Sequence, residues 1–167
     1  AAGKLNFQDP AIAVDLAGQG PSTLIGFLAF GLAERRKPLT ILSCDNRIEN
    51  GKALEIAVAD FAGAAGLDVN WDTIRFPNSM VDCIVPATGP KELALAKGFG
   101  IEDAVPVTHE NFRQWVIEDK FCAGRPDWDK AGVTFTDNVH AFEAMKIRIL
   151  NGGHQLIADA GEILSVN

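Results

Sequence analysis

Apolar side chains recur at two spacings along the chain, and each spacing predicts a different element. Where they return every three or four positions, as at Leu24, Phe27 and Leu28, an amphipathic helix is expected. Where they form a short run between turn residues, as over residues 39–43, a buried strand is expected. Strands and helices alternate through most of the sequence, which predicts an α/β domain.

Residues that start or stop helices set the expected boundaries. Asp9 before Pro10 is typical of a helix cap followed by proline in the first turn, and Ser22 can cap the next helix, which Pro38 ends. The predicted helices cover residues 10–16, 22–36, 52–65, 91–97, 140–150 and, after a glycine pair, on to about 164. The predicted strands cover residues 39–43, 73–76, 105–108, 115–117 and 133–136. The helical end of the chain predicts the start of an all-α domain.

Composition and charge narrow the class of protein. The 167 residues are 47% hydrophobic and 22% charged, which is ordinary globular usage. The net charge of −7 repels phosphate backbones, so no nucleic-acid partner is expected. No apolar run reaches the roughly 18 to 20 residues of a membrane span, so no membrane partner is expected either. Cys44, Cys83 and Cys122 stand far apart, which favours a reducing, cytoplasmic setting over a disulfide framework.

The N-terminal part offers one glycine-rich segment, but its context is wrong for a nucleotide loop. Gly18-Gln19-Gly20 begins like GxGxxG, yet Thr23 stands at the third glycine position. The fingerprint needs a strand before it, whereas residues 10–16 are expected to be helical. We interpret the segment as a turn between helices. Because the chain also lacks an initiator methionine, we expect it to be an internal piece of a longer protein.

A stretch near the C-terminal end gathers polar side chains suited to oxygen chemistry. On a regular α-helix, which turns about 100° per residue, Glu143 and His154 fall within about 80° of Lys146. Asn151 falls at about 140°, on the edge of the same broad face. The glycine pair at 152–153 is unfavourable inside a helix, which fits a backbone that something approaches closely. The alternative is the solvated face of an amphipathic helix.

Two further features bear on ligand binding. Ser43-Cys44-Asp45-Asn46 follows a predicted strand, where α/β sheets bind ligands, so Asn46 could donate a hydrogen bond; the alternative is a turn and helix cap. The three histidines of the chain are widely separated, and neither HxxxH nor HExxH occurs. No metal site is therefore expected.

Four sequence blocks stand out by their order and spacing: Leu42-Ser43-Cys44-Asp45-Asn46 with Asn50-Gly51; Phe76-Pro77-Asn78-Ser79-Met80-Val81-Asp82; Phe112-Arg113-Gln114-Trp115-Val116-Ile117-Glu118-Asp119; and Glu143-Ala144-Met145-Lys146 with Asn151 and His154. Together they resemble the long-chain polyol dehydrogenase family of mannitol 2-dehydrogenases and fructuronate reductases. The resemblance implies the C-terminal part of a Rossmann-like cofactor domain over residues 1–137. Residues 138–167 would then start a helical substrate domain. The nucleotide's glycine loop would lie upstream, so the remainder of the full-length enzyme is an expected partner and no cofactor-binding residue is assigned.

The resemblance also implies an activity. It is hydride transfer at a CH–OH group between a nicotinamide cofactor and a sugar alcohol or ketose, with mannitol and fructose the leading pair and no zinc. The expected cofactor is NAD, with NADP as the alternative. Lys146 would be the general base, and Glu143 could pass its proton to water.

The remaining roles implied by the resemblance concern the substrate. Asn46 and Asn151 would hydrogen-bond the developing oxyanion, and Asn46 would also bind substrate. His154 would hold a substrate oxygen, and Asp82 would bind substrate. Together with Lys146 these residues form the expected catalytic and substrate-binding set.

Departures from the family pattern leave the substrate open. Cys83 stands where arginine is usual, Arg47-Ile48 where Leu-Pro is common, and Phe142 where tyrosine is common. A hexuronate reductase acting on fructuronate or tagaturonate is therefore an alternative. An inactive fragment without the nucleotide loop is another, and a Schiff-base lysine at Lys146, as in aldolases, is a third.

Overall fold

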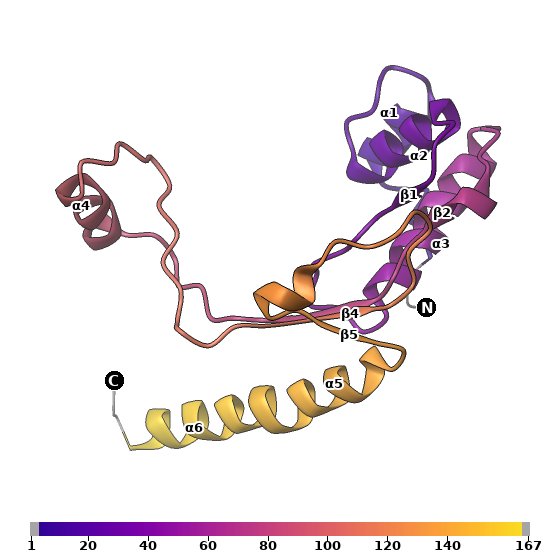
Figure 1. The fold of residues 1–167 in the computed structure, drawn as a ribbon. Helices are drawn as coiled ribbons and strands as arrows, with labels where there is room; N and C mark the ends of the chain where they lie inside the picture. Colours follow the sequence, from indigo (N-terminus) through magenta and orange to yellow (C-terminus); the bar gives the residue numbers. More distant parts are fainter. Residues whose placement is uncertain (1–3, 165–167) are drawn as a thin grey trace.

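The computed structural model describes residues 4–164 and has two parts (Figure 1). In the first part three helices gather beside a short parallel sheet of two strands. Its elements are α1 (Pro10–Leu16), α2 (Leu24–Glu34), β1 (Leu39–Thr40), α3 (Asn50–Ala64), η1 (Trp71–Thr73) and β2 (Ile74–Arg75). The predicted α/β class is confirmed.

The second part is a three-stranded sheet with a long arm and a long helix. The sheet has the order β3-β4-β5, with β3 antiparallel and β5 parallel to the central β4. Its elements are β3 (Ser79–Asp82), α4 (Pro90–Gly98), β4 (Gln114–Glu118), η2 (Trp128–Ala131) and β5 (Thr134–Thr136). The chain between β3 and β4 forms the arm, which holds α4 well away from the other helices (Figure 1).

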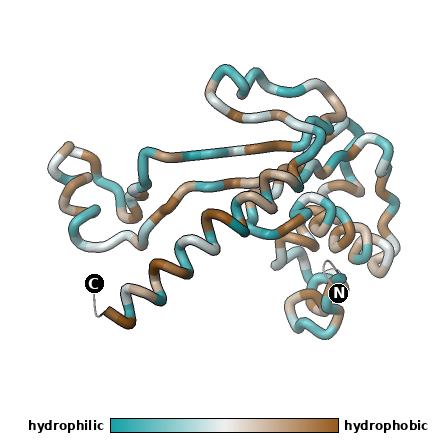
Figure 2. Tube along the Cα trace, turned by 90° about the horizontal axis from the view of Figure 1, so that it is seen from below, coloured by the Kyte–Doolittle hydropathy of each residue, from teal (hydrophilic) through white to brown (hydrophobic). Residues whose placement is uncertain are grey.

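The last three elements run on as one helix beneath this sheet (Figure 1). They are α5 (Val139–Met145), the π-helical segment η3 (Lys146–Asn151) and α6 (Gly152–Ile163). Asn138 caps the start, because its side chain accepts a hydrogen bond from the Ala141 amide at 3.3 Å. Hydrophobic residues remain exposed along α6 (Figure 2). In the part of the chain that the structure describes, no helix is long and apolar enough to cross a membrane.

The turn from α1 into α2 is organised by the buried carboxylate of Asp15. This carboxylate accepts hydrogen bonds of 2.6–2.9 Å from the amides and hydroxyls of Ser22 and Thr23. Burial raises the pKa of Asp15, but these hydrogen bonds, with the Thr23 hydroxyl first, outweigh burial and hold the pKa well below its usual range. Gly26 lies so close that a Cβ there would strike the carboxylate. Thr23, not the expected Ser22, caps α2 through its hydroxyl.

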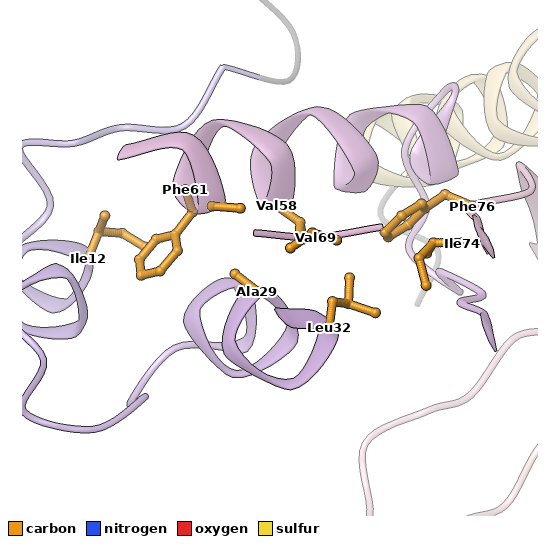
Figure 3. Packing of buried hydrophobic residues seen from close by; sticks show 9 residues of the cluster. Ile12, Ala29, Leu32, Val58, Phe61, Val69, Ile74 and Phe76 are labelled. Atoms are coloured by element: carbon orange, nitrogen blue, oxygen red, sulfur yellow. The ribbon is translucent and has the colours of Figure 1, made fainter. Parts of the chain in front are cut away.

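The main hydrophobic core lies between α2 and α3, as Figure 3 shows. Phe61 from α3 is fully buried and meets Phe30 edge-on, with ring centroids 5.7 Å apart. The buried cluster consists of Ile12, Ala29, Leu32, Val58, Phe61, Ala62, Val69, Ile74 and Phe76. A separate small cluster of Met80, Val116 and Val139 joins the three-stranded sheet to α5.

The structure differs from the strand predictions in three places. The strand expected at residues 105–108 is wrong: this segment is irregular and lies on the arm, with Val105 and Val107 exposed. Valines favour strands, but a strand needs a neighbour that supplies backbone partners. The strand expected at 39–43 is shortened to Leu39–Thr40. A third difference is strand β3, which was not expected because its four residues begin with Ser79, end with Asp82 and show no alternation of polar and apolar side chains.

Candidate active site

Lys146 lies where a loop, a strand and a helix meet. Its Nζ donates a hydrogen bond to Asn46 Oδ1 at 2.6 Å and another to the backbone carbonyl of Val81, and lies 3.6 Å from Asp82 Oδ1. The side chains of Lys146 and Asp82 are only 13% and 11% exposed. Asn46 comes from the loop after β1, Val81 and Asp82 from β3, and Lys146 from the start of the π-helical segment. Residues 100 positions apart thus converge on one ammonium group.

This group faces a cavity of about 1240 Å³. The cavity is lined by all five residues expected to bind or transform substrate, namely Asn46, Asp82, Lys146, Asn151 and His154. It therefore combines a cation, a carboxylate, two amides and an imidazole around one space. Such a set can bind a polyhydroxylated molecule and exchange a proton with one of its hydroxyls.

The π-helical segment changes how the C-terminal residues share a face. On a regular helix Asn151 would lie at about 140° from Lys146. In the π-helix the hydrogen bonds join residues i and i+5, so the turn is wider and residue i+5 comes closer to the face of residue i than in an α-helix. Asn151 is five residues after Lys146 and lines the same cavity. The expected angular offset is therefore wrong, and the wider turn is the reason.

Glu143 departs from the arrangement expected from sequence. Its side chain is only 6% exposed and does not line the large cavity. One carboxylate oxygen accepts a hydrogen bond from the Glu49 amide at 3.0 Å, and the other lies 3.4 Å from His140 Nδ1. Glu143 and Lys146 line a second, much smaller cavity of about 50 Å³. Within residues 4–164 no hydrogen bond joins these two side chains.

Several residues of the cavity were not singled out from the sequence. Trp115 at the start of β4 stacks on Trp128, with ring centroids 5.3 Å apart, and both line the cavity. Arg113 and His109 reach it from the arm. The block at residues 112–119 was noticed for its resemblance, and its cluster of aromatic and polar residues at a strand start was the available signal.

Metal sites and the glycine-rich turn were the two other ligand-binding features that the sequence raised. Among the described residues, no group of three or more His, Cys, Asp or Glu side chains could hold a metal ion. Gly18 and Gly20 have positive φ angles of 75° and 92° in the turn between α1 and α2. No strand precedes this turn within the described residues, so its interpretation as an inter-helix turn is confirmed.

Solved structures share this fold at recognisable sequence identity. A D-sorbitol dehydrogenase in its substrate-free form superposes with a TM-score of 0.80 at 35% identity, over 91% of this chain and 33% of that one. The mannitol 2-dehydrogenase of Pseudomonas fluorescens, in a ternary complex with NAD and D-mannitol, gives a TM-score of 0.76 at 42% identity. The match covers 89% of this chain and 32% of that one.

Curated relatives point the same way. The mannitol 2-dehydrogenase of Cereibacter sphaeroides is 48% identical over 99% of this chain and 36% of its own length. The D-mannonate oxidoreductase of Escherichia coli K12 is 42% identical over 96% of this chain and 35% of its own length. The chain thus spans about a third of the length of these relatives. Since the family model of the mannitol dehydrogenase Rossmann domain also matches residues 7–130, the chain belongs to the mannitol dehydrogenase family.

Proposed function

We propose that this chain carries the catalytic lysine of an NAD-dependent dehydrogenase that interconverts a sugar alcohol and its ketose, with mannitol and fructose as the leading pair. The observation that carries the proposal is the convergence of Asn46, Asp82 and the Val81 carbonyl on Lys146 in a large cavity. The family membership and the NAD and D-mannitol named for the Pseudomonas structure support it.

Lys146 is the general base of the proposed reaction. As its neutral amine it takes the hydroxyl proton of the polyol while a hydride leaves the same carbon, so that a C–H bond breaks and a C=O bond forms. NAD, when bound, supplies the hydride acceptor. The cavity of about 1240 Å³ exceeds the usual size of a single small-ligand site, so a polyol and a nicotinamide ring can share it.

The amides and the imidazole hold the reacting oxygen and its neighbours. Because Asn46 Oδ1 accepts from Lys146, its Nδ2 group is left to donate to the substrate oxygen beside the lysine. Asn151, one π-turn further along, donates to the same oxygen from the helix. In ketose reduction these amides stabilise the oxyanion before Lys146 returns the proton. His154 and Asp82 hold other hydroxyls of the substrate.

Glu143 can accept the proton of Lys146 and pass it toward solvent. The small cavity that both residues line leads to a carboxylate whose other neighbour, His140, is 73% exposed. A water molecule in this cavity can carry the proton from Nζ to Glu143, and His140 can release it to solvent. This proton relay is part of the proposal. We also propose that the cofactor domain extends to residue 137 and that a helical substrate domain begins at residue 138.

Zinc independence and a cytoplasmic setting complete the proposal. In this scheme Lys146 provides the proton chemistry that zinc-bound water provides in metal-dependent dehydrogenases. The three cysteines are free, as expected for a reducing compartment. Activity of the full-length protein should therefore survive prolonged treatment with a strong chelator, and loss of activity that zinc restores contradicts this part.

The test is a substrate panel with the full-length protein. NADH oxidation is followed with fructose, fructuronate and tagaturonate, and NADPH replaces NADH in a parallel series. We expect fructose and NADH to give the highest kcat/KM. No NADH oxidation with any member of the panel contradicts the proposed activity.

A hexuronate reductase is the second candidate. The 42% identity to the D-mannonate oxidoreductase of Escherichia coli favours it, and Arg113 in the cavity wall could pair with a substrate carboxylate. A kcat/KM for fructuronate at least tenfold above that for fructose selects this candidate.

An inactive fragment and a Schiff-base enzyme are each distinguished from a dehydrogenase by a direct measurement. The 167-residue chain by itself, if it is an inactive fragment, folds without measurable NADH affinity. A Schiff-base mechanism leaves a covalent adduct on Lys146 after treatment with borohydride and a ketose, whereas a dehydrogenase leaves none.

A further inference from the structure

Asn50 makes an unusually complete set of side-chain hydrogen bonds. It is the first residue of α3 and is 2% exposed. Its Nδ2 lies 2.9–3.3 Å from the backbone carbonyls of Ser43, Asp45 and Ser79 and from the Ser79 hydroxyl. Its Oδ1 accepts from the amides of Ser79 and Gly51 at 2.9 and 2.7 Å. Both ends of this buried amide are therefore fully used.

These bonds join the two segments that carry the partners of Lys146. The carbonyls of Ser43 and Asp45 belong to the loop that presents Asn46, and Ser79 begins β3, which presents Val81 and Asp82. The Ser79 hydroxyl also donates to the Ser43 carbonyl at 2.5 Å, which closes the ring of contacts. The loop and the strand are thus fixed to each other mainly through one side chain.

The chain makes room for this contact at the neighbouring position. A Cβ at Gly51 would lie 2.6 Å from the Phe76 carbonyl oxygen and even closer to that of Pro77. Only glycine lets the first turn of α3 approach the segment before β3 this closely. The Asn50-Gly51 pair therefore seats the helix start against the strand, and neither residue touches the cavity.

We infer that Asn50 is a positioning residue, which sets the distance between Asn46 and the Val81 carbonyl around Lys146. The inference rests on the proposed function and extends it to a residue outside the cavity. Asn50 is not a conventional helix cap, because Glu49 occupies that position and its side chain makes no capping bond. Its bonds run across the fold to residues 29 positions away.

The chemistry of the amide explains why asparagine is needed. The Nδ2 group shares its two N–H donors among three nearby carbonyls, and the Oδ1 end accepts from two amides. An aspartate has no donor and turns an oxygen toward three carbonyl oxygens, whereas a leucine satisfies none of the groups. Loss of the donor end leaves buried carbonyls without a partner and loosens the loop.

The experiment compares Asn50→Asp and the milder Ser79→Ala in the full-length protein. We expect kcat to fall by about 10- to 100-fold in Asn50→Asp, since a shift of about 1 Å in a reacting group has an effect of this size. Ser79→Ala keeps the Asn50 amide and should lose about threefold to tenfold. The matched control is Val58→Ala, a fully buried apolar residue of the same helix, which should leave kcat within twofold.

Hydrogen exchange supplies a readout that does not depend on turnover. Amides of residues 43–46 and 79–82 should exchange faster in Asn50→Asp and Ser79→Ala, while amides of α2 keep their wild-type rates. A double variant supplies a second test. In the Lys146→Ala background, Asn50→Asp should lower kcat by less than about threefold, because the lysine amine whose partners Asn50 positions is absent.

The possible outcomes separate the two proposals. If Lys146→Ala is nearly inactive while both Asn50→Asp and Ser79→Ala keep the wild-type kcat despite faster local exchange, Asn50 is only structural and the inference is wrong. If Asn50→Asp fails to fold, Ser79→Ala decides by the same criteria. If Lys146→Ala itself keeps the wild-type rate, the proposed base is wrong and the positioning role is overturned with it.

Discussion

Phe61 and eight other buried apolar residues from α1, α2, α3 and the segments about β2 pack into one cluster. Around Lys146, the buried apolar cluster is only Met80, Val116 and Val139. The second region is held by hydrogen bonds between distant segments, such as those between Asn50 and Ser79 and the one from the Glu49 amide to the Glu143 carboxylate. The first region fits a stable support, and the second fits a site that needs defined directions more than buried area.

This difference makes a general prediction about variants. Apolar burial is non-directional, so a change in the first region should lower stability without altering the reaction. Hydrogen bonds are directional, so a change in the second region should alter turnover more than stability. Substitutions at Lys146, Phe61, Asp15 and Glu49 test the distinction, from the largest expected effect to the smallest.

Lys146→Ala tests the reactive side of the comparison most strongly. We expect kcat of the full-length protein to fall by about 10²–10⁴, the usual range for a general base, with little change in stability. The matched control is Lys52→Ala, because Lys52 is exposed and its ammonium pairs, within residues 4–164, with Glu49 alone at 3.5 Å. Steady-state kinetics measure both variants. A Lys146→Ala variant within tenfold of wild type contradicts its role as base.

Phe61→Ala tests the supporting side. Removing this fully buried ring should lower the free energy of unfolding by about 3–5 kcal/mol, while kcat per folded molecule is unchanged. Phe99→Ala serves as the control, since Phe99 is 75% exposed and its removal should change stability by less than about 0.5 kcal/mol. Chemical denaturation gives the stabilities. Equal effects of the two variants would break the comparison.

Asp15→Asn tests the strongly hydrogen-bonded carboxylate that is buried in the first region, beside its apolar core. Because the pKa of Asp15 is depressed in the folded protein, its stabilising contribution is present above the ordinary carboxyl value near 3.9 and is lost as the pH falls below it. The wild type should thus be more stable than Asp15→Asn at neutral pH, and the two should converge in acid.

Denaturation at a series of pH values checks this convergence. Thr23→Val is a useful companion, because it removes the hydroxyl that contributes most to the depressed pKa. Because Thr23→Val brings the folded-state pKa closer to the ordinary value, the acid loss of stability should be smaller than in wild type and complete at a higher pH. A wild-type advantage over Asp15→Asn that stays constant well below a pH of about 3.9 contradicts the explanation.

Glu49→Gly probes the strained link between the two regions. Glu49 has φ 52°, in the left-handed region, and its side chain forms an exposed pair with Lys52. Glycine relieves the strain but raises the entropy of the unfolded chain, so we expect a change in stability within about 1 kcal/mol. The Glu49 amide still donates to Glu143, so kcat should stay the same.

Glu49→Val provides the contrast for this smallest effect. A β-branched residue is poorly tolerated in the left-handed region, so Glu49→Val should be less stable than Glu49→Gly by about 1–2 kcal/mol. Thermal unfolding of the two variants measures the difference. Equal stabilities would show that the conformation at residue 49 carries no strain.

Much of the first region could be predicted from the sequence because its signals are local. The Asp9-Pro10 start of α1 and the apolar spacing of α2 depend on residues a few positions apart. The gathering of Lys146, Asn151 and His154 was expected from their spacing and from a family resemblance. The part of the site on one helix was therefore accessible before the structure.

What the sequence did not reveal depends on distant contacts. Glu143 has the spacing of a cavity residue, yet the Glu49 amide, 94 positions earlier, draws its carboxylate inward. Strand β3 is recognisable only once β4 lies beside it, with Met80 opposite Val116. The valines at 105–108 have strand propensity but meet no partner strand among the described residues. Local pattern carries none of this information.

The π-helical turn makes the number of residues between Lys146 and His154 a property of the site. In this wider turn Asn151 and His154 lie near the face that residues one position earlier would take in a regular α-helix. If the segment closed into a regular α-helix at unchanged length, Asn151 and His154 would turn to about 140° and about 80° from Lys146, although neither side chain is altered. For a lineage that inherits this gene, a change that abolishes the wide turn is therefore as damaging as the loss of a substrate-binding side chain, unless one codon of the segment is lost with it.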